Sequence, residues 1–200
     1  MRRRLRSSAA RSGAPSPPPW NPIGPRPPGE PEVVAFYGED AIVAGHPEDT
    51  CTPSFWLDFP PGTVTTIIMQ GWNDPWMVAY AHSHNIRVLQ AAGGPCEGYT
   101  NTSGAAMLAN ATYRSELVAQ FNQSIRVSGL DGWGWDIEET DPLYQPHVAL
   151  FIQELRRACP EAYQAFYTQN LVGKGTWLAW EAEPMKLIAA NVDMIIASTY

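Results

Sequence analysis

Two acidic side chains lie two residues apart, at Asp136 and Glu138. On a β-strand both carboxyl groups would point to the same face, with their Cα atoms about 6.5 Å apart. Two carboxyl groups this close cannot both ionise cheaply, so one of them keeps its proton near neutral pH. A retained proton is what a general acid needs, so this spacing indicates acid–base chemistry.

The residues around the two acids have the pattern of a buried strand. One face is bulky and apolar, and the other is narrow and then acidic, as two interleaved sets of residues show: Trp133, Trp135 and Ile137, and Gly132, Gly134, Asp136 and Glu138. In a (β/α)8 barrel the bulky face of a strand meets the outer helices, and catalytic residues lie at the C-terminal ends of strands. We therefore expect a barrel strand that carries both acids into the barrel mouth.

Further apolar segments alternate with helical patterns on both sides of this strand. The expected strands are 33–37, 64–69, 86–90, 162–167 and 191–200, and the expected helices are 75–84, 103–127, one after 141–142 and one within 177–190. Such alternation favours parallel βα units. A closed barrel needs eight strands, whereas about six are present. The predicted fold class is α/β, a (β/α)8 TIM barrel apparently truncated after about six strands.

The acidic stretch resembles the signature of the family 18 glycoside hydrolases, the chitinase family. That signature reads Asp-Gly, two positions, Asp, one position, Asp, one position, Glu. Its start matches Asp131 and Gly132, and its end matches Asp136 and Glu138, whereas Gly134 stands where the family has its middle Asp. The stretch is most similar to the di-N-acetylchitobiase branch, which has Asn at that position.

The resemblance covers residues 33–200 and includes a match at the final segment, 193–200. It implies a retaining, substrate-assisted glycosidase that cleaves β-1,4 bonds next to N-acetylglucosamine. By the same resemblance, Glu138 would be the proton donor, Asp136 would stabilise the acetamide nitrogen of the substrate, and Tyr200 would hydrogen-bond to the acetamide. The implied partner is an N-acetylglucosamine oligosaccharide, with no cofactor and no metal.

The glycine in place of the middle acid changes the expected electrostatics. In the family, the middle Asp shares a proton with the Asp two residues on. With Gly134 there, Asp136 has only Glu138 as an acidic neighbour, so we expect Asp136 to ionise and Glu138 to stay protonated. The space beside Gly134 must then be filled by water or by a side chain from another strand. Asp131 and Gly132, near the start of the strand, are expected to be structural.

Two other functions fit the same residues. The chain could be a non-catalytic sugar-binding relative of the same fold, or a fragment without activity of its own. The presence of Glu138 favours the enzyme, because binding-only relatives usually lack that acid. Glu139 and Asp141 are expected to be solvated loop acids.

The composition excludes several other classes. A net charge of −7 over 200 residues argues against nucleic acid as a partner, and no apolar run is long enough to span a membrane. The three cysteines do not have the spacing of a zinc site. His82 and His84 do not share a helix face, so structural or solvent roles are favoured over a zinc pair.

Residues 1–32 are rich in Arg, Pro, Ser and Gly, and we expect them to be disordered, with the catalytic barrel domain at 33–200. They lack the apolar region of a signal peptide, which leaves an organelle transit peptide or a non-native upstream extension. Three glycosylation sequons begin at Asn101, Asn110 and Asn122. Together with the family, they indicate a lysosomal, vacuolar or extracellular protein.

Overall fold

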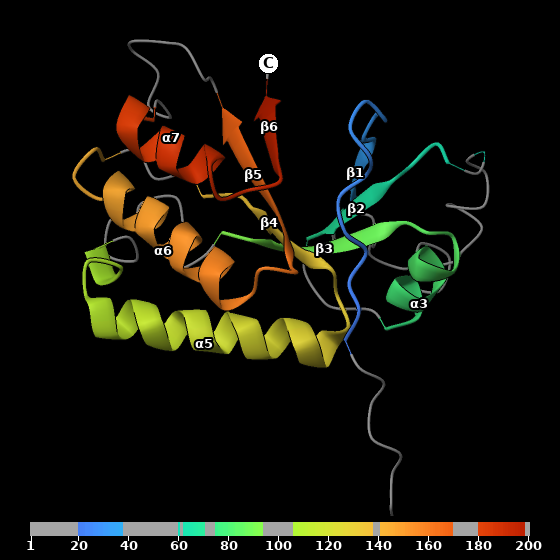
Figure 1. The fold of residues 1–200 in the computed structure, drawn as a ribbon, viewed down its shortest axis with the longest axis horizontal. Coiled ribbons are helices and arrows are strands. Elements are labelled where there is room, and N and C mark those ends of the chain that lie inside the picture. Colours follow the sequence, from blue (N-terminus) through green and yellow to red (C-terminus); the bar gives the residue numbers. More distant parts are fainter. Residues whose placement is uncertain are drawn as a thin grey trace, which may run out of the picture.

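The computed structural model describes residues 20–37, 60, 62–70, 75–93, 106–137, 141–169 and 180–198. Six parallel strands form one sheet whose spatial order follows the sequence (Figure 1). The elements, in chain order, are β1 Val34–Tyr37, β2 Thr66–Met69, α3 Pro75–Ser83, β3 Arg87–Ala92, α5 Ala111–Ser128, β4 Gly132–Trp135, α6 Gln145–Ala158, β5 Tyr163–Gln169, α7 Ala182–Ala189 and β6 Met194–Ser198.

The sheet curls into part of a barrel with its helices on the outside. Helices α5, α6 and α7 pack side by side against one half of the sheet, and α3 lies beside β3 (Figure 1). This is the βα repeat expected when parallel strands alternate with amphipathic helices. The predicted TIM-barrel type of fold is confirmed over six strands. Among the helices that the structure describes, none is long and apolar enough to cross a lipid bilayer.

Helix α5 begins later than the apolar pattern predicts, at Ala111 rather than near residue 103. Asn110 is the reason, because its side-chain oxygen accepts hydrogen bonds from the backbone N–H groups of Thr112 and Tyr113. The helix ends at Gly129, whose φ of 74° is left-handed and favours glycine. This end places the chain directly before β4.

Helix α6 packs one apolar face into the core. On α6 the fully buried residues include Val148, Phe151, Ile152 and Leu155. Helix α7 begins at Ala182 and ends at Ala189, inside the range 177–190 in which the sequence predicts a helix, and residues 170–179 before it lie outside the described part of the chain.

The N-terminal segment differs from the expectation. Residues 20–32 are described, and they run along the N-terminal end of the barrel, where Trp20 Nε1 donates to the Leu130 carbonyl at 2.8 Å. The guanidinium of Arg126 lies over the Trp20 ring, 4.6 Å from its centre. Disorder is therefore the wrong prediction for residues 20–32, because composition alone does not show which buried polar groups a segment can satisfy. Residues 1–19 lie outside the described residues, and the domain boundary at residue 33 stays a prediction.

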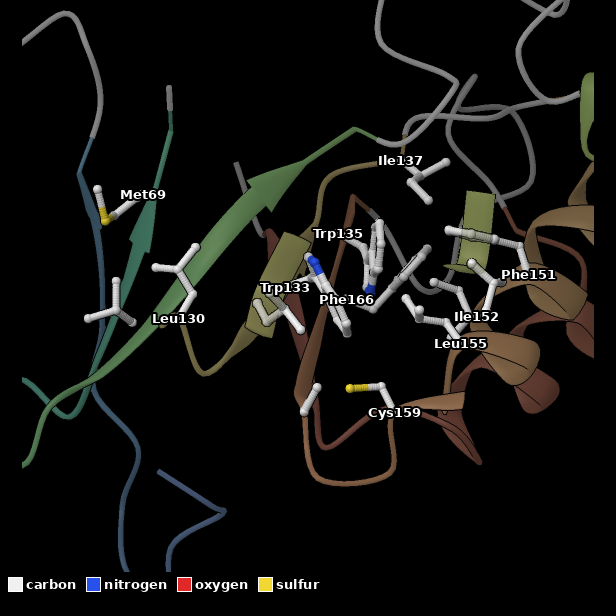
Figure 2. Close-up of a cluster of buried hydrophobic side chains, with 14 of the residues drawn as sticks. Met69, Leu130, Trp133, Trp135, Ile137, Phe151, Ile152, Leu155, Cys159 and Phe166 are labelled. Atoms are coloured by element: carbon white, nitrogen blue, oxygen red, sulfur yellow. The ribbon is translucent and has the colours of Figure 1, made fainter. Parts of the chain in front are cut away.

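The main core lies between the outer face of the sheet and the helices (Figure 2). Trp133 and Trp135 of β4 are buried there, and Phe121 of α5 contacts both, with ring centres 6.0 and 5.2 Å away. Phe151 of α6 packs edge-on to Trp135 at 5.4 Å. The prediction that the tryptophans of the motif face the helices is confirmed.

A smaller cluster fills the inner side of the sheet. Its fully or nearly fully buried members are Ile68, Leu89, Tyr163 and Ala165, one or two from each of β2, β3 and β5. Strand β4 adds only glycine to this inner side, so its neighbours approach closely. The two glycines therefore decide how β4 fits into the barrel.

Candidate functional site

Asp136 lies at the C-terminal end of β4 and faces the inside of the barrel. Its backbone N–H donates to the carbonyl of Ala92 on β3 at 3.0 Å. The residues on either side of it, Trp135 and Ile137, are both buried in the outer core, so Asp136 must point the other way. The side chain is half-buried, and its Oδ1 atom is shielded from solvent. Barrel enzymes hold their catalytic groups at this end of the strands.

The space beside Gly134 is filled by Ile68 of β2. A Cβ atom at Gly134 would lie 2.9 Å from Cγ2 and 3.2 Å from Cδ1 of the Ile68 side chain. The sequence required either water or a side chain from another strand at this place, and the structure shows a side chain. Because Ile68 is buried and apolar, no acid fits at position 134 unless Ile68 moves.

Gly132, two residues earlier, meets backbone rather than a side chain. A Cβ atom there would lie 1.8 Å from the carbonyl oxygen of Tyr163 on β5. Gly132 and Tyr163 are paired in the strand register. A residue with a side chain at this position would prevent β4 and β5 from pairing as they do, so glycine is required here.

Asp131 is fully buried at the N-terminal end of the same strand. Its Oδ1 accepts the backbone N–H of Ile23 at 2.6 Å, and its Oδ2 accepts the backbone N–H of Val88 at 2.7 Å. His82 Nε2 lies 2.8 Å from Oδ2. The carboxylate thus joins the N-terminal segment, β3 and α3, far from the end of the strand where Asp136 lies.

The hydrogen bond to Asp131 raises the pKa of His82, while burial acts in the opposite direction. The His82 side chain is 31% exposed, so solvent screens this interaction in part. The other candidate histidine, His84, faces Tyr80, with ring centres 4.3 Å apart and Nδ1 2.9 Å from the Tyr80 carbonyl. The two histidines therefore have different partners, and within the described residues no group of three His, Cys, Asp or Glu side chains could hold a metal.

Arg87 is the second buried anchor at this end of the barrel, with 1% of its surface exposed. Its Nη1 donates to both carboxylate oxygens of Glu32, at 3.0 and 3.2 Å, and to Thr66 Oγ1 at 2.8 Å. Its Nε donates to the Ile23 carbonyl at 3.0 Å, and Nη2 donates to the Gly24 carbonyl. A buried guanidinium is tolerated because each of its nitrogens has an acceptor.

Both ionisable neighbours of Arg87 respond to this environment. Burial alone would raise the pKa of Glu32, but the hydrogen bond and charge of Arg87, with help from Thr66, hold it below its ordinary value. The guanidinium also lies over the Tyr163 ring, 3.7 Å from its centre. Burial raises the pKa of Tyr163 to about 12. This end of the barrel is therefore a satisfied polar network that fixes residues 23–32 to the sheet.

Two aromatic residues that sequence reasoning did not single out lie at the opposite end of the barrel. Trp135 pairs with Phe166 at the end of the β4–β5 register, and Tyr167 is the next residue along β5. The Tyr167 ring meets Phe36 of β1 edge-on, with ring centres 6.1 Å apart and an interplanar angle of 81°. The available signal was the alternation of residues 163, 165 and 167 on the expected fifth strand. It places the Tyr167 ring on the inner face of the sheet, the face of Tyr163 and Ala165.

The structure brings together only part of the predicted site. Asp131, Gly132, Gly134 and Asp136 all lie on or beside β4, whereas Glu138 and Tyr200 lie outside the described residues. Cys159 is free and buried, and the other two cysteines and Asn101 also lie outside the described part. Asp141 is described, and its side chain accepts the backbone N–H of Leu143 at 2.9 Å, just before α6. The catalytic roles of Asp136, Glu138 and Tyr200 stay predictions.

The sequence matches no family model and no curated protein, but its fold is similar to that of solved chitinase structures. Catalytic domain 2 of the group II chitinase of Ostrinia furnacalis has a TM-score of 0.65 and 19% identity, over 84% of this chain and 50% of that one. The same domain has been solved as a mutant in complex with a penta-N-acetylchitooligosaccharide. The C-terminal domain of a chitinase-named protein from Desulfitobacterium hafniense has a TM-score of 0.63 and 14% identity, over 84% of this chain and 54% of that one.

YKL-39, solved in the presence of chitooligosaccharides, has a TM-score of 0.62 and 14% identity, over 84% of this chain and 51% of that chain. The chain thus spans about half the length of the structures it matches. At these identities the likeness shows the fold, which is chitinase-like. It gives no support to the di-N-acetylchitobiase branch in particular.

Proposed function

We propose that the C-terminal end of β4 carries the acids of a glycosidase site that cleaves β-1,4 bonds of N-acetylglucosamine oligomers. The observation that carries this proposal is the place of Asp136, an inward-facing acid at the end of a central parallel strand in a chitinase-like fold. Glu138 follows two positions later, where it would continue the same face. Site residues rather than the fold decide the chemistry.

In the proposed mechanism the substrate supplies the nucleophile. The acetamide carbonyl oxygen attacks the anomeric carbon as Glu138 gives its proton to the departing glycosidic oxygen, which leaves as an alcohol. The resulting oxazolinium ion carries a positive charge that the Asp136 carboxylate stabilises, and Tyr200 hydrogen-bonds to the acetamide. Water then attacks the anomeric carbon and gives a proton to Glu138, which restores the acid.

The inner wall of this site is apolar where chitinases have a further acid. Ile68 occupies the space next to Gly134, so in our proposal the negative charge of Asp136 is not shared with a carboxyl group at that position. An ionised Asp136 favours the protonated form of Glu138, because two adjacent negative charges repel. One ionised acid, Asp136, and one protonated acid, Glu138, then suffice for the attack of the acetamide and for the later attack of water.

The proposal is tested by Glu138→Gln in the full-length protein that contains residues 1–200, with Glu139→Gln as the matched control. Hydrolysis of a chromogenic chitobiose glycoside should fall by a factor of about 10² or more in Glu138→Gln, the scale of a general acid, and stay near normal in the control. A glucoside, which lacks the acetamide, should not be cleaved by the parent protein. Near-normal turnover by a folded Glu138→Gln protein would remove Glu138 from the mechanism. Retained oligosaccharide binding without any hydrolysis by the parent would identify a sugar-binding protein instead.

A preference for chitobiose, as in the branch that the sequence most resembles, is the finer part of the proposal. This proposed preference rests on the residues around Gly134 alone. Hydrolysis rates measured on N-acetylglucosamine oligomers from the dimer to the hexamer test the preference, because a chitobiase hydrolyses the short substrates fastest.

A further inference from the structure

Two of the glycosylation sequons lie within the described residues, and the structure places their asparagines in different surroundings. The sequon of Asn110 covers the residue before α5 and the first two residues of that helix, and all three residues are exposed. The sequon of Asn122 lies within α5, and its asparagine is half-buried. Because both sequons have the pattern of an acceptor site, only the fold distinguishes them.

The Asn110 side chain has an engaged oxygen and an unengaged nitrogen. Oδ1 accepts the backbone N–H groups of Thr112 and Tyr113, at 3.0 and 3.3 Å, and so caps α5. Among the residues that the structure describes, none accepts a hydrogen bond from Nδ2 of Asn110. A glycan is joined to asparagine through Nδ2, so a glycan at this position would leave the helix cap in place.

The turn that carries Asn110 is anchored on its inner side. The Asn110 N–H donates to the Met107 carbonyl at 3.0 Å, and the Asn110 carbonyl accepts the N–H of Arg114 at 3.0 Å. Arg114 Nη1 donates to the carbonyl of the fully buried Leu108 at 2.6 Å, and Arg114 Nη2 donates to Glu154 of α6 at 2.9 Å. The Asn110 side chain therefore stands on a fixed turn and faces solvent.

Asn122 uses both polar atoms of its side chain for contacts within the fold. Its Oδ1 accepts Arg126 Nε at 2.9 Å, and its Nδ2 donates at 3.3 Å to the carbonyl of Ala158, the last residue of α6. The guanidinium of Arg126 in turn lies over the Trp20 ring. A bulky glycan on Nδ2 of Asn122 would therefore disturb the contact between α5 and α6.

We propose that Asn110 is an N-glycosylation site of this protein and that Asn122 is not. The co-reactant is a lipid-linked oligosaccharide pyrophosphate of the secretory pathway. Nδ2 of Asn110 forms a bond to the anomeric carbon of the first sugar and loses one proton, while the bond from that carbon to the pyrophosphate oxygen breaks and the lipid pyrophosphate leaves. Oδ1 continues to cap α5. This inference does not depend on the proposed glycosidase activity.

The test maps glycans on the full-length protein that contains residues 1–200, sent into the secretory pathway of animal cells by a fused signal peptide. Treatment with a peptide N-glycosidase in heavy-oxygen water converts each glycosylated asparagine to labelled Asp, which peptide mass spectrometry detects. In protein that melts cooperatively, the label should be found at Asn110 in most molecules and at Asn122 in few. Thr112→Ala should lose the mass of one glycan on a gel, and Ser124→Ala, the matched control in the other sequon, should lose none.

The two variants leave both asparagines in place. Thr112→Ala keeps the cap of α5, because Asn110 binds the backbone N–H and not the hydroxyl group of residue 112. If Thr112→Ala does not melt cooperatively, Asn110→Asp gives the same test, since Asp removes the acceptor and is an equally good cap. Unlabelled Asn110 in the folded protein would overturn the proposal. Equal labelling of Asn110 and Asn122, or a glycan lost in Ser124→Ala, would overturn the selection of one sequon by the fold.

Discussion

Asp131 and Asp136 belong to the same strand region, five residues apart, yet they lie at opposite ends of the barrel and differ in nearly every physical respect. Asp131 is fully buried and accepts hydrogen bonds from two backbone N–H groups, with His82 as a third partner. Asp136 is half-buried at the C-terminal end of the strand, on the inner face of the barrel. A carboxylate surrounded by donors contributes to stability, whereas one that faces an open mouth is available to a substrate.

The two ends of the barrel follow the same division. At the N-terminal end of the strands, Arg87, Glu32 and Asp131 form a network in which residues 20–32 supply several of the partners. At the C-terminal end, the inner face carries the exposed ring of Phe36, the half-buried ring of Tyr167 and the half-buried carboxyl group of Asp136. In TIM barrels the first end serves stability and the second serves chemistry. Substitutions at the two ends should therefore separate stability from activity.

The largest difference in folding stability is expected between alanine substitutions at the two glycines of β4. Gly132→Ala should destabilise the protein by more than about 3 kcal/mol, because its Cβ would collide with backbone that cannot move without breaking the β4–β5 pairing. Gly134→Ala meets only the Ile68 side chain, which can change its rotamer, and should cost about 1 kcal/mol. Urea unfolding followed by circular dichroism measures both.

Ile68→Ala combined with Gly134→Ala is the control for this contrast, since it removes the contact partner. The double variant should recover part of the loss that each single change causes. Equal destabilisation by Gly132→Ala and Gly134→Ala would show that the close Tyr163 backbone at Gly132 restricts a side chain no more than the Ile68 side chain at Gly134 does.

A smaller contrast is expected between the two aspartates. Asp131→Asn keeps the shape but places an amide donor against backbone N–H groups that need acceptors, which should cost about 2 kcal/mol of stability. Asp136→Asn should change stability by less than about 1 kcal/mol and lower the rate on a chitobiose glycoside by about 10². Thermal melts and initial rates on the same preparations compare them.

The reverse result, with Asp136→Asn unfolding the protein and Asp131→Asn abolishing turnover in a stable one, would invert the assignment of the two ends. Asn at both positions also keeps side-chain volume matched, so a packing effect does not enter the comparison.

The smallest change in folding stability is expected when His82 loses its proton as the pH rises. Asp131 raises its pKa in the folded state, so the stabilisation is complete below the unfolded pKa of about 6.5 and is lost as the pH rises through the folded value. Because the ring is partly exposed, the loss between pH 6 and pH 8 should be below about 1 kcal/mol. Urea midpoints across this range should shift in the parent and shift less in His82→Gln. A steeper pH dependence in His82→Gln would assign the titration to another group.

The sequence by itself determined the strand positions, the parallel βα order and the face on which each residue of β4 lies. These features are local, because alternation of side chains along a strand and apolar periodicity along a helix do not depend on distant partners. That is why Trp133 and Trp135 could be assigned to the helix side and Asp136 to the inner side before the fold was known. Helix capping is local in the same way. The Asn110 side chain caps α5 and makes the helix begin later than the apolar pattern predicts.

Only the tertiary structure decided what the inner face of β4 meets. Ile68 beside Gly134 is 66 residues distant in sequence, Phe36 beside Tyr167 is 131 residues distant, and Trp20 reaches Leu130 across 110 residues. Such contacts depend on the register and curl of the whole sheet, which no local pattern encodes. The order of residues 20–32 has the same cause: their composition resembles a disordered tail, but the buried carboxylate of Asp131 and the guanidinium of Arg87 need partners that this segment provides.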